Sequence, residues 1–157
     1  KLMNKDVILM NKKEKALEIF KNKFNCSQAV LSVFAEELGV EKEIYLKIST
    51  AFGGGMRKGE VCGAVTGALM GLGLNYGHYK SEDLESKDRT YELTKEFIKK
   101  FECINGSILC KNLLGHDLSK EEEMKIIKEK GLLTTLCPKV IGDAVDILEN
   151  ILSDNKN

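Results

Sequence analysis

The chain has 157 residues, of which 43% are hydrophobic, and its 24 lysines and arginines balance its 24 aspartates and glutamates. This amount of apolar material can form the core of one domain, so the composition excludes a disordered chain. The absence of net charge argues against a general nucleic-acid binder, which usually carries a basic excess. No secretory signal pattern and no twin-arginine pair occur, so we expect a cytoplasmic protein.

Helical periodicity dominates the chain, and no stretch alternates for long enough to indicate a strand. We therefore expect an all-α fold, a compact bundle of six to eight helices around a central glycine-rich buried helix. Residues 1–10 are expected to form an N-terminal lead, either a cloning remnant or a frayed end, and residues 11–157 a single domain. In chain order, helices are expected over about 12–21, 26–38, 41–52, 61–76, 81–101, 107–114, 119–131 and 138–152.

Several of these helices have recognisable start signals. Asn25 and Ser27 can cap the second helix, and Ser81 can cap the long charged one. Ser119 opens a capping-box sequence. Pro138 suits the first position of the last helix, because proline has no N–H to leave unpaired there.

Residues 61–79 contain no charged side chain, so they form either a membrane span or a buried helix. We favour a helix over 61–76 that is buried on all sides, because five glycines interrupt the stretch and no aromatic belts flank it. Gly63, Gly67 and Gly71 recur every fourth residue, which gives one face almost no side chains. That face admits either a ligand or another backbone, and plain helix packing is the simpler interpretation.

The five cysteines include no CxxC pair, which argues against zinc ribbons, ferredoxin-type runs, thioredoxin-type sites and covalent haem. In the expected helices, Cys26, Cys62 and Cys137 lie at N-termini, where free backbone N–H groups and the helix dipole stabilise a thiolate. Cys110 lies inside a short helix, and Cys103 ends the long one. Each cysteine alone can be explained as a small buried apolar residue, so it is the repeated placement that favours a joint role.

Residues 53–59 form a glycine loop in front of the central helix. Its backbone N–H groups, with Arg57 and Lys58, can bind an anion or approach a cluster or thiolate, and a plain turn is the alternative. Because Cys62 lies beside these two cations, we expect it to have the lowest pKa of the five cysteines and Cys103 the highest. His78 and His116 have no recognisable nucleophile or carboxylate partner, so a hydrolase triad is not indicated.

Several sequence runs then occur in a familiar order. They are Phe24-Asn-Cys26-Ser-Gln-Ala-Val30, Ala51-Phe-Gly-Gly-Gly-Met56, Cys62-Gly-Ala-Val-Thr-Gly67 and Cys110-Lys-Asn-Leu-Leu-Gly115 with Asp117, followed by Cys137. Over about 24–148 the chain resembles the C_GCAxxG_C_C family, whose members are named as redox-active for their cysteine pattern but have no established reaction. The resemblance implies four functional cysteines, and Cys103 falls outside the pattern. Some members carry a twin-arginine signal, which hints at a bound prosthetic group such as an iron–sulfur cluster.

We therefore predict a redox protein whose functional cysteines are brought together by the fold: Cys26, Cys62, Cys110 and Cys137. They either hold a metal, with an iron–sulfur cluster as the leading choice, or act as dithiol/disulfide pairs without a cofactor. The protein would be an oxidoreductase or electron-transfer component with an unknown redox partner protein, without nucleic acid or a membrane span. The candidate cofactor-binding positions are Gly53, Gly54, Gly55, Gly63 and Gly67. The alternative is a small helical binding or adaptor module with incidental buried cysteines.

Overall fold

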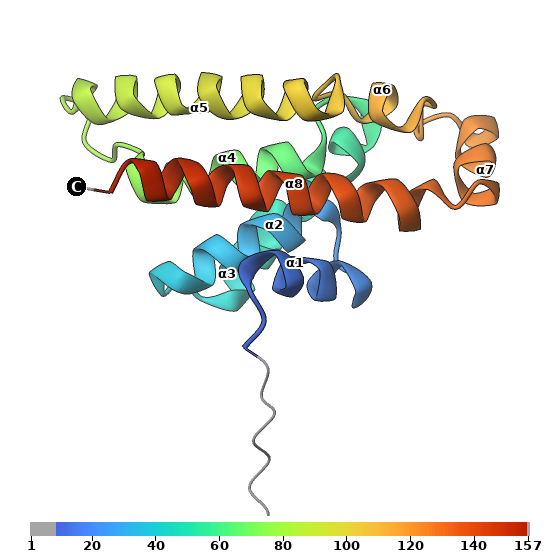
Figure 1. Cartoon of the computed structure of the whole chain (residues 1–157), viewed down its shortest axis with the longest axis horizontal. Coiled ribbons are helices and arrows are strands. Elements are labelled where there is room, and N and C mark those ends of the chain that lie inside the picture. The colour runs from blue at the N-terminus through green and yellow to red at the C-terminus, as the bar shows by residue number, and fades with distance from the viewer. Residues whose placement is uncertain (1–8, 157) are drawn as a thin grey trace, which may run out of the picture.

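The computed structural model describes residues 9–156 (Figure 1). The expected lead over 1–10 lies outside the described residues except for Leu9 and Met10. The described chain forms eight α-helices and no strand, which confirms the all-α prediction and the expected number of helices. The helices are α1 (Lys12–Lys21), α2 (Cys26–Ala35), α3 (Lys42–Ser49), α4 (Gly63–Tyr76), α5 (Leu84–Asn105), α6 (Cys110–Leu114), α7 (Glu121–Glu129) and α8 (Leu132–Asp154).

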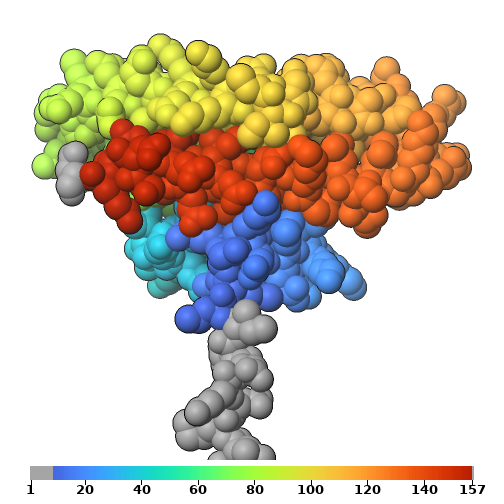
Figure 2. Space-filling view, viewed as in Figure 1, coloured from blue at the N-terminus to red at the C-terminus, as the bar shows by residue number. Residues whose placement is uncertain are grey.

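The two long helices, α5 and α8, run side by side along the length of the molecule (Figure 1). The first three helices pack below α8, and α4 contacts α2, α5 and α8. The short helices α6 and α7 lie at the end remote from the C-terminus (Figure 1). In the space-filling view, the N-terminal helices form a block against the layer made by α5 and α8 (Figure 2).

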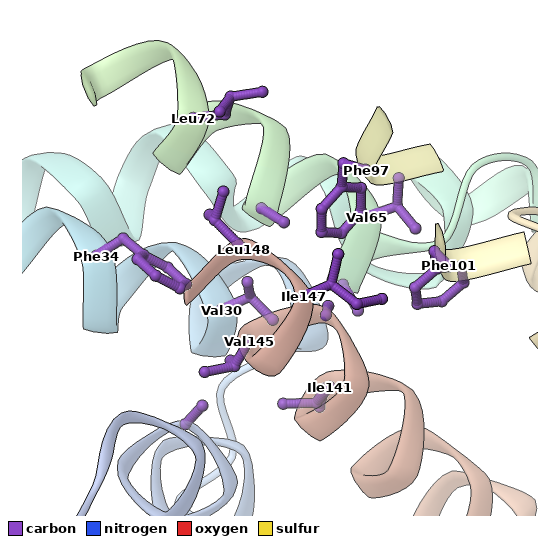
Figure 3. Packing of buried hydrophobic residues seen from close by; sticks show 14 of the residues in the cluster. Val30, Phe34, Val65, Leu72, Phe97, Phe101, Ile141, Val145, Ile147 and Leu148 are labelled. Carbon is purple, nitrogen blue, oxygen red and sulfur yellow. The ribbon is translucent and has the colours of Figure 1, made fainter. Parts of the chain in front are cut away.

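The main core lies where α2, α4, α5 and α8 meet (Figure 3). Its large buried side chains come from all four helices: Val30, Phe34, Val65, Leu72, Phe97, Phe101, Ile141, Val145, Ile147 and Leu148. Burial of such side chains is worth about 1.5–3 kcal/mol each, so this cluster fixes how the four helices are arranged. The ends of α2 and α4 that carry cysteines are held in place by this core.

The glycine-bearing face of α4 packs directly on α2. A Cβ added at Gly67 would lie 2.6 Å from the carbonyl oxygen of Ser27, and one at Gly71 would lie 3.2 Å from the Cβ of Phe34. The repeated glycines thus allow a close approach of two helix backbones, as the packing interpretation requires.

The helix α4 is central, but the expectation that it is buried on all sides is wrong. Its opposite face, which includes Thr66, Leu69 and Met70, is only partly covered, and Leu74 is 44% exposed. Met70 packs at the edge of the small cluster of Leu31, Ala35 and Tyr45, which covers this face only in part. Within residues 9–156, no helix combines the length and the apolar character that crossing a membrane requires.

At α2 the predicted cap Asn25 is confirmed, whereas Ser27 takes no part in the cap, and α1 begins at residue 12 as expected. Asn11 and Glu14 form a capping box at α1, and Asn25 and Gln28 form one at α2. In α2 the backbone N–H of Gln28 donates to the Asn25 side chain at 3.0 Å, and the N–H of Asn25 donates to Gln28 Oε1 at 2.9 Å. These reciprocal bonds fix Cys26 as the first residue of α2.

Three other expected helix starts are wrong. The cap of α5 is Asp83, not Ser81, since the Asp83 carboxylate accepts the N–H of Ser86. The hydroxyl of Ser119 donates to Asp117 instead of capping α7. The helix expected to open at 107 is displaced, because the pairing of Val61 with Leu109 keeps the chain extended up to the start of α6.

The last helix starts six residues before Pro138, which lies inside it. Gly131, with a left-handed φ of 64°, reverses the chain between α7 and α8. Leu133 and Leu136 then pack on the buried residues of the C-terminal half, so burial stabilises a first helical turn that proline alone did not predict. Cys137 therefore lies within α8 and not at its N-cap, contrary to expectation.

Candidate functional site

The N-termini of α2 and α4 meet at two cysteines. Cys26 is the first residue of α2, and Cys62 is the N-cap residue of α4. Gly63 makes this meeting possible, because a Cβ on Gly63 would collide with the sulfur of Cys26. The sequence Cys62-Gly63 therefore places Cys62 beside the sulfur of Cys26, and the missing side chain of Gly63 leaves room for that sulfur.

The sulfur of Cys26 is surrounded by hydrogen-bond donors. The thiol of Cys62 donates to it, and so do the backbone N–H groups of Gly54, Ser27 and Cys26 itself. The hydrogen bond from Cys62 has the largest effect and, with the N–H groups, outweighs burial, so the pKa of Cys26 falls to about 6. Such a thiol is mostly ionised at pH 7.

Cys62 has the opposite character. Its hydrogen bond to the Cys26 sulfur, its burial and the negative charge of Cys26 all raise its pKa well above the usual value. The expectation that Cys62 has the lowest cysteine pKa is therefore wrong. The cation that we assigned to it, Arg57, instead lowers the pKa of Cys110, where burial has the larger, opposite effect.

The glycine loop reaches Cys26 through an unusual backbone. Four consecutive residues, from Gly54 to Arg57, have φ between 58° and 64° and so form a left-handed turn. The N–H of Glu60 closes it by donating to the carbonyl of Gly55 at 3.1 Å. For Met56 and Arg57 this conformation costs about 1–2 kcal/mol each. The turn delivers the Gly54 N–H to the Cys26 sulfur, as expected for a loop that approaches a thiolate.

The antiparallel pairing of Val61 with Leu109 holds Cys110, the next residue, close to Cys62. The N–H of Cys62 donates to the carbonyl of Ile108, and the N–H of Cys110 donates to the carbonyl of Glu60, both at 2.7 Å. Burial, followed by the charge of Cys26, raises the pKa of the Cys110 thiol to about 11. Cys110 is thus a buried, protonated thiol near the first two cysteines.

The fourth cysteine of the predicted set, Cys137, lies on α8. It packs on the small apolar cluster that contains Cys110 and Ile127. Burial raises its pKa to about 12, and the charges of Cys26 and Cys110 act in the same direction. The four predicted cysteines therefore interact electrostatically, with Cys26 as the one favoured thiolate.

Cys103 is exposed in the last turn of α5 and belongs to none of the buried clusters. His78 is exposed after α4, and His116 is half-buried after α6. None of these three residues is among the causes that shift the cysteine pKa values. The site is accordingly built from the four other cysteines.

A metal ion needs several ligand atoms converging on one point. Among residues 9–156, no three or more histidine, cysteine, aspartate or glutamate side chains are grouped so that they could hold a metal ion. We therefore derive no step through a cluster, and metal binding by the four cysteines stays a prediction.

The five candidate cofactor-binding glycines all lie against other parts of the chain. A Cβ at Gly53 would lie 2.6 Å from the Asn25 side chain, and one at Gly54 would lie 2.7 Å from Arg57. At Gly55 it would meet the backbone of Glu60. With the contacts of Gly63 and Gly67 given above, close chain packing accounts for each position, and a cofactor role for them stays a prediction.

Sequence reasoning missed one polar group at this site. The hydroxyl oxygen of Ser27 is buried next to Cys26 and has no hydrogen-bond partner among residues 9–156. An unpaired buried hydroxyl costs about 1–3 kcal/mol. No signal in the sequence indicates it, because Ser27 reads equally well as a capping residue.

The fold and the site together define a small helical protein in which helix N-termini and a strained loop hold a thiolate against a thiol. The chain belongs to the family described as "Putative redox-active protein (C_GCAxxG_C_C)", whose sequence profile matches residues 24–151. This finding confirms the resemblance and supports a redox role for the cysteines. No curated protein and no solved structure matches the chain.

Proposed function

We propose that this protein is a dithiol/disulfide oxidoreductase in which Cys26 is the attacking thiolate and Cys62 the second thiol. The observation that carries the proposal is the meeting of the α2 and α4 N-termini, where Gly63 leaves room for the Cys26 sulfur beside Cys62 and the pKa of Cys26 is lowered. Thiol–disulfide exchange requires a thiolate as nucleophile and a neighbouring thiol to release the mixed disulfide. The accessibility of the two residues matches these roles, because Cys26, the attacking residue, is half-buried, whereas Cys62, the second thiol, is buried.

The reaction would proceed in two steps. The Cys26 thiolate attacks one sulfur of a substrate disulfide, forms a Cys26–substrate disulfide and expels the other sulfur as a thiolate. Cys62 then loses its proton and attacks the Cys26 sulfur, which forms a Cys26–Cys62 disulfide and releases the second substrate thiol. Two electrons pass from the cysteine pair to the substrate, and the proton of Cys62 goes to a leaving thiolate.

In this proposal Cys110 and Cys137 remain protonated reserve thiols beside the reacting pair. Their pKa values of about 11 and 12 make them weak nucleophiles at neutral pH. When Cys26 becomes part of a disulfide, its negative charge disappears and one cause of their raised pKa values is removed. Burial, the larger cause, remains, so both thiols stay protonated while the first pair reacts.

The test is a redox titration of the purified protein in dithiothreitol buffers, with alkylation and counting of free thiols. We expect a reversible two-electron transition that converts Cys26 and Cys62 to a disulfide. It should be lost in Cys26→Ser and Cys62→Ser and unchanged in the control Cys103→Ser. Metal analysis and a visible spectrum of anaerobically purified protein test the metal alternative. Stoichiometric iron with visible absorption would replace the proposal by a cluster, and neither iron nor a redox transition would favour the adaptor alternative.

A further inference from the structure

The guanidinium group of Arg57 lies close to the reactive sulfur. Its nitrogen Nη1 is 2.7 Å from the position that a Cβ on Gly54 would take. The backbone N–H of the same glycine donates to the Cys26 sulfur. Because one residue without a side chain contacts both groups, covalent geometry and hydrogen-bond length keep the guanidinium nitrogen within about 10 Å of that sulfur.

The same charge also acts on a second site cysteine. Arg57 lowers the pKa of the Cys110 thiol, although burial and the charge of Cys26 raise it further, to about 11. The side chain of Leu118, which packs in one cluster with Cys110, lies 3.1 Å from the same Gly54 position as the guanidinium does. The guanidinium is therefore near Cys110 as well as Cys26.

The described chain offers no carboxylate that neutralises Arg57. Among the residues that the structure describes, Arg57 forms no ion pair. The two carboxylates of this region are engaged elsewhere. Glu60 pairs with Lys111 at 3.3 Å, and Asp117 accepts hydrogen bonds from the backbone N–H and the hydroxyl of Ser119. Since Arg57 is exposed, its donors are open to a ligand.

The backbone holds Arg57 in a strained conformation. Its φ of 60° is left-handed, which any residue with a Cβ adopts only against steric repulsion. Glycine adopts this conformation freely, and glycines occupy the two positions before Met56 in the same turn. Strained residues of this kind cluster at functional sites. The strain indicates a role that needs the side chain of Arg57.

The chemistry of the guanidinium indicates what it binds. Its donors form a planar fork that matches the two oxygens of a carboxylate. With an ionic hydrogen bond of about 2.8 Å and a sulfur–sulfur bond of about 2.05 Å, two CH2 groups between carboxylate and sulfur span the distance from Arg57 to Cys26. The positive charge also offsets the repulsion between a substrate carboxylate and the Cys26 thiolate.

We propose that Arg57 binds a carboxylate of the substrate, so that the protein reacts preferentially with disulfides that carry a carboxylate within a few bonds of their sulfur. The inference rests on the proposed function, since it names the substrate class of the same cysteine pair. The Cys26 thiolate bonds to one substrate sulfur, and the other leaves as a thiolate that takes up a proton. Cys62 then forms the disulfide with Cys26 and releases the second thiol, so the protein dithiol is oxidised and the substrate reduced.

The test uses three disulfides that differ only in the group at the end of two CH2 groups. At neutral pH, 3,3′-dithiodipropionate is anionic, bis(2-hydroxyethyl) disulfide is uncharged and cystamine is cationic. The rate constant of each probe with the reduced protein is divided by its rate constant with 2-mercaptoethanol, which removes the intrinsic reactivity of the probe. We expect the normalised rate of the anionic probe to exceed that of the uncharged one at least about threefold, and the cationic probe to be slowest.

Variants test whether Arg57 causes this preference. Arg57→Gln should slow the anionic probe about three- to fivefold and leave the uncharged probe within about 1.5-fold of wild type. Arg57→Lys keeps the charge but not the planar fork, so it should restore only part of the loss. Lys120→Gln is the matched control, because it removes an equal charge near Asp117 that is already paired with Glu123 at 3.6 Å, and it should change neither rate.

Carboxylate binding and the cysteine chemistry fail these tests in different ways. If Arg57→Gln slows all three probes equally, Arg57 activates the Cys26 thiolate instead of binding the substrate. If Lys120→Gln slows the anionic probe as much as Arg57→Gln does, only the net charge of the protein matters. Either result, or equal normalised rates of the three probes with wild type, overturns the inference and leaves the cysteine pair active. If no probe yields a Cys26–Cys62 disulfide on peptide mapping, the proposed function itself is contradicted.

Discussion

Replacing Gly67 by alanine tests the close contact between α2 and α4 that brings Cys26 and Cys62 together. The new Cβ would lie 2.6 Å from the carbonyl oxygen and 3.1 Å from the Cα of Ser27, both of them backbone atoms. Alanine gains about 1 kcal/mol in helix propensity. Because backbone cannot rotate away, overpacking should cost about 2–3 kcal/mol, which is more than this gain, so the variant should be less stable than wild type by about 1–2 kcal/mol.

Gly73 provides the matched control in the same helix. A Cβ added there would meet no atom within 4 Å, and Gly73 lies inside α4. Gly73→Ala should therefore gain about 0.5–1 kcal/mol from propensity alone. In thermal unfolding of the reduced proteins, we expect Gly73→Ala to raise Tm by about 1–4 °C and Gly67→Ala to lower it by about 2–8 °C. Equal stability of the two variants would refute the close helix contact.

Three further predictions concern the site. Ser27→Ala removes a buried hydroxyl without a partner among residues 9–156 and should raise the free energy of unfolding by about 1–2 kcal/mol in urea titrations; a loss of stability would show that the hydroxyl is paired. Met56→Gly should raise it by up to about 1 kcal/mol, because glycine adopts the φ of 59° without strain, and a decrease would argue against the left-handed turn. The reduced protein should gain stability as pH rises from about 6 to 9, since over that range the unfolded state binds the Cys26 proton and the folded state does not. Unfolding titrations at several pH values should show a rise of up to about 4 kcal/mol that is absent from Cys26→Ser; an unchanged slope in that variant would assign the rise to other groups.

Local signals predicted much of the architecture. Asn25 caps the start of α2 as predicted, and the uncharged helix with glycines at every fourth residue proves to be the central α4. These features depend on neighbours within one or two turns, so sequence alone reveals them. The start of α8 depends instead on tertiary burial of leucines that precede Pro138, which a local proline rule does not detect.

The site was predicted less well, for the same reason. Helix-dipole reasoning placed Cys26 and Cys62 at N-termini but could not show that their sulfurs meet, because 36 positions separate them in the chain. Once they meet, ionisation of Cys26 suppresses that of Cys62, and this reverses the expected order of their pKa values. The pairing of Cys62 with Ile108 has no sequence signal at all. A metal cofactor and a cytoplasmic location stay predictions.

The most direct test of the central claim is a pH titration of the Cys26 thiol in the reduced protein. Alkylation is followed at each cysteine by peptide mapping, and the midpoint of the rate for Cys26 gives its pKa. We predict a midpoint near pH 6 that rises in Cys62→Ala, because the hydrogen bond from Cys62 has the largest influence on it. A midpoint at or above about 8.5, the value of a free thiol, that does not change in Cys62→Ala would contradict the assignment of Cys26 as the activated thiolate.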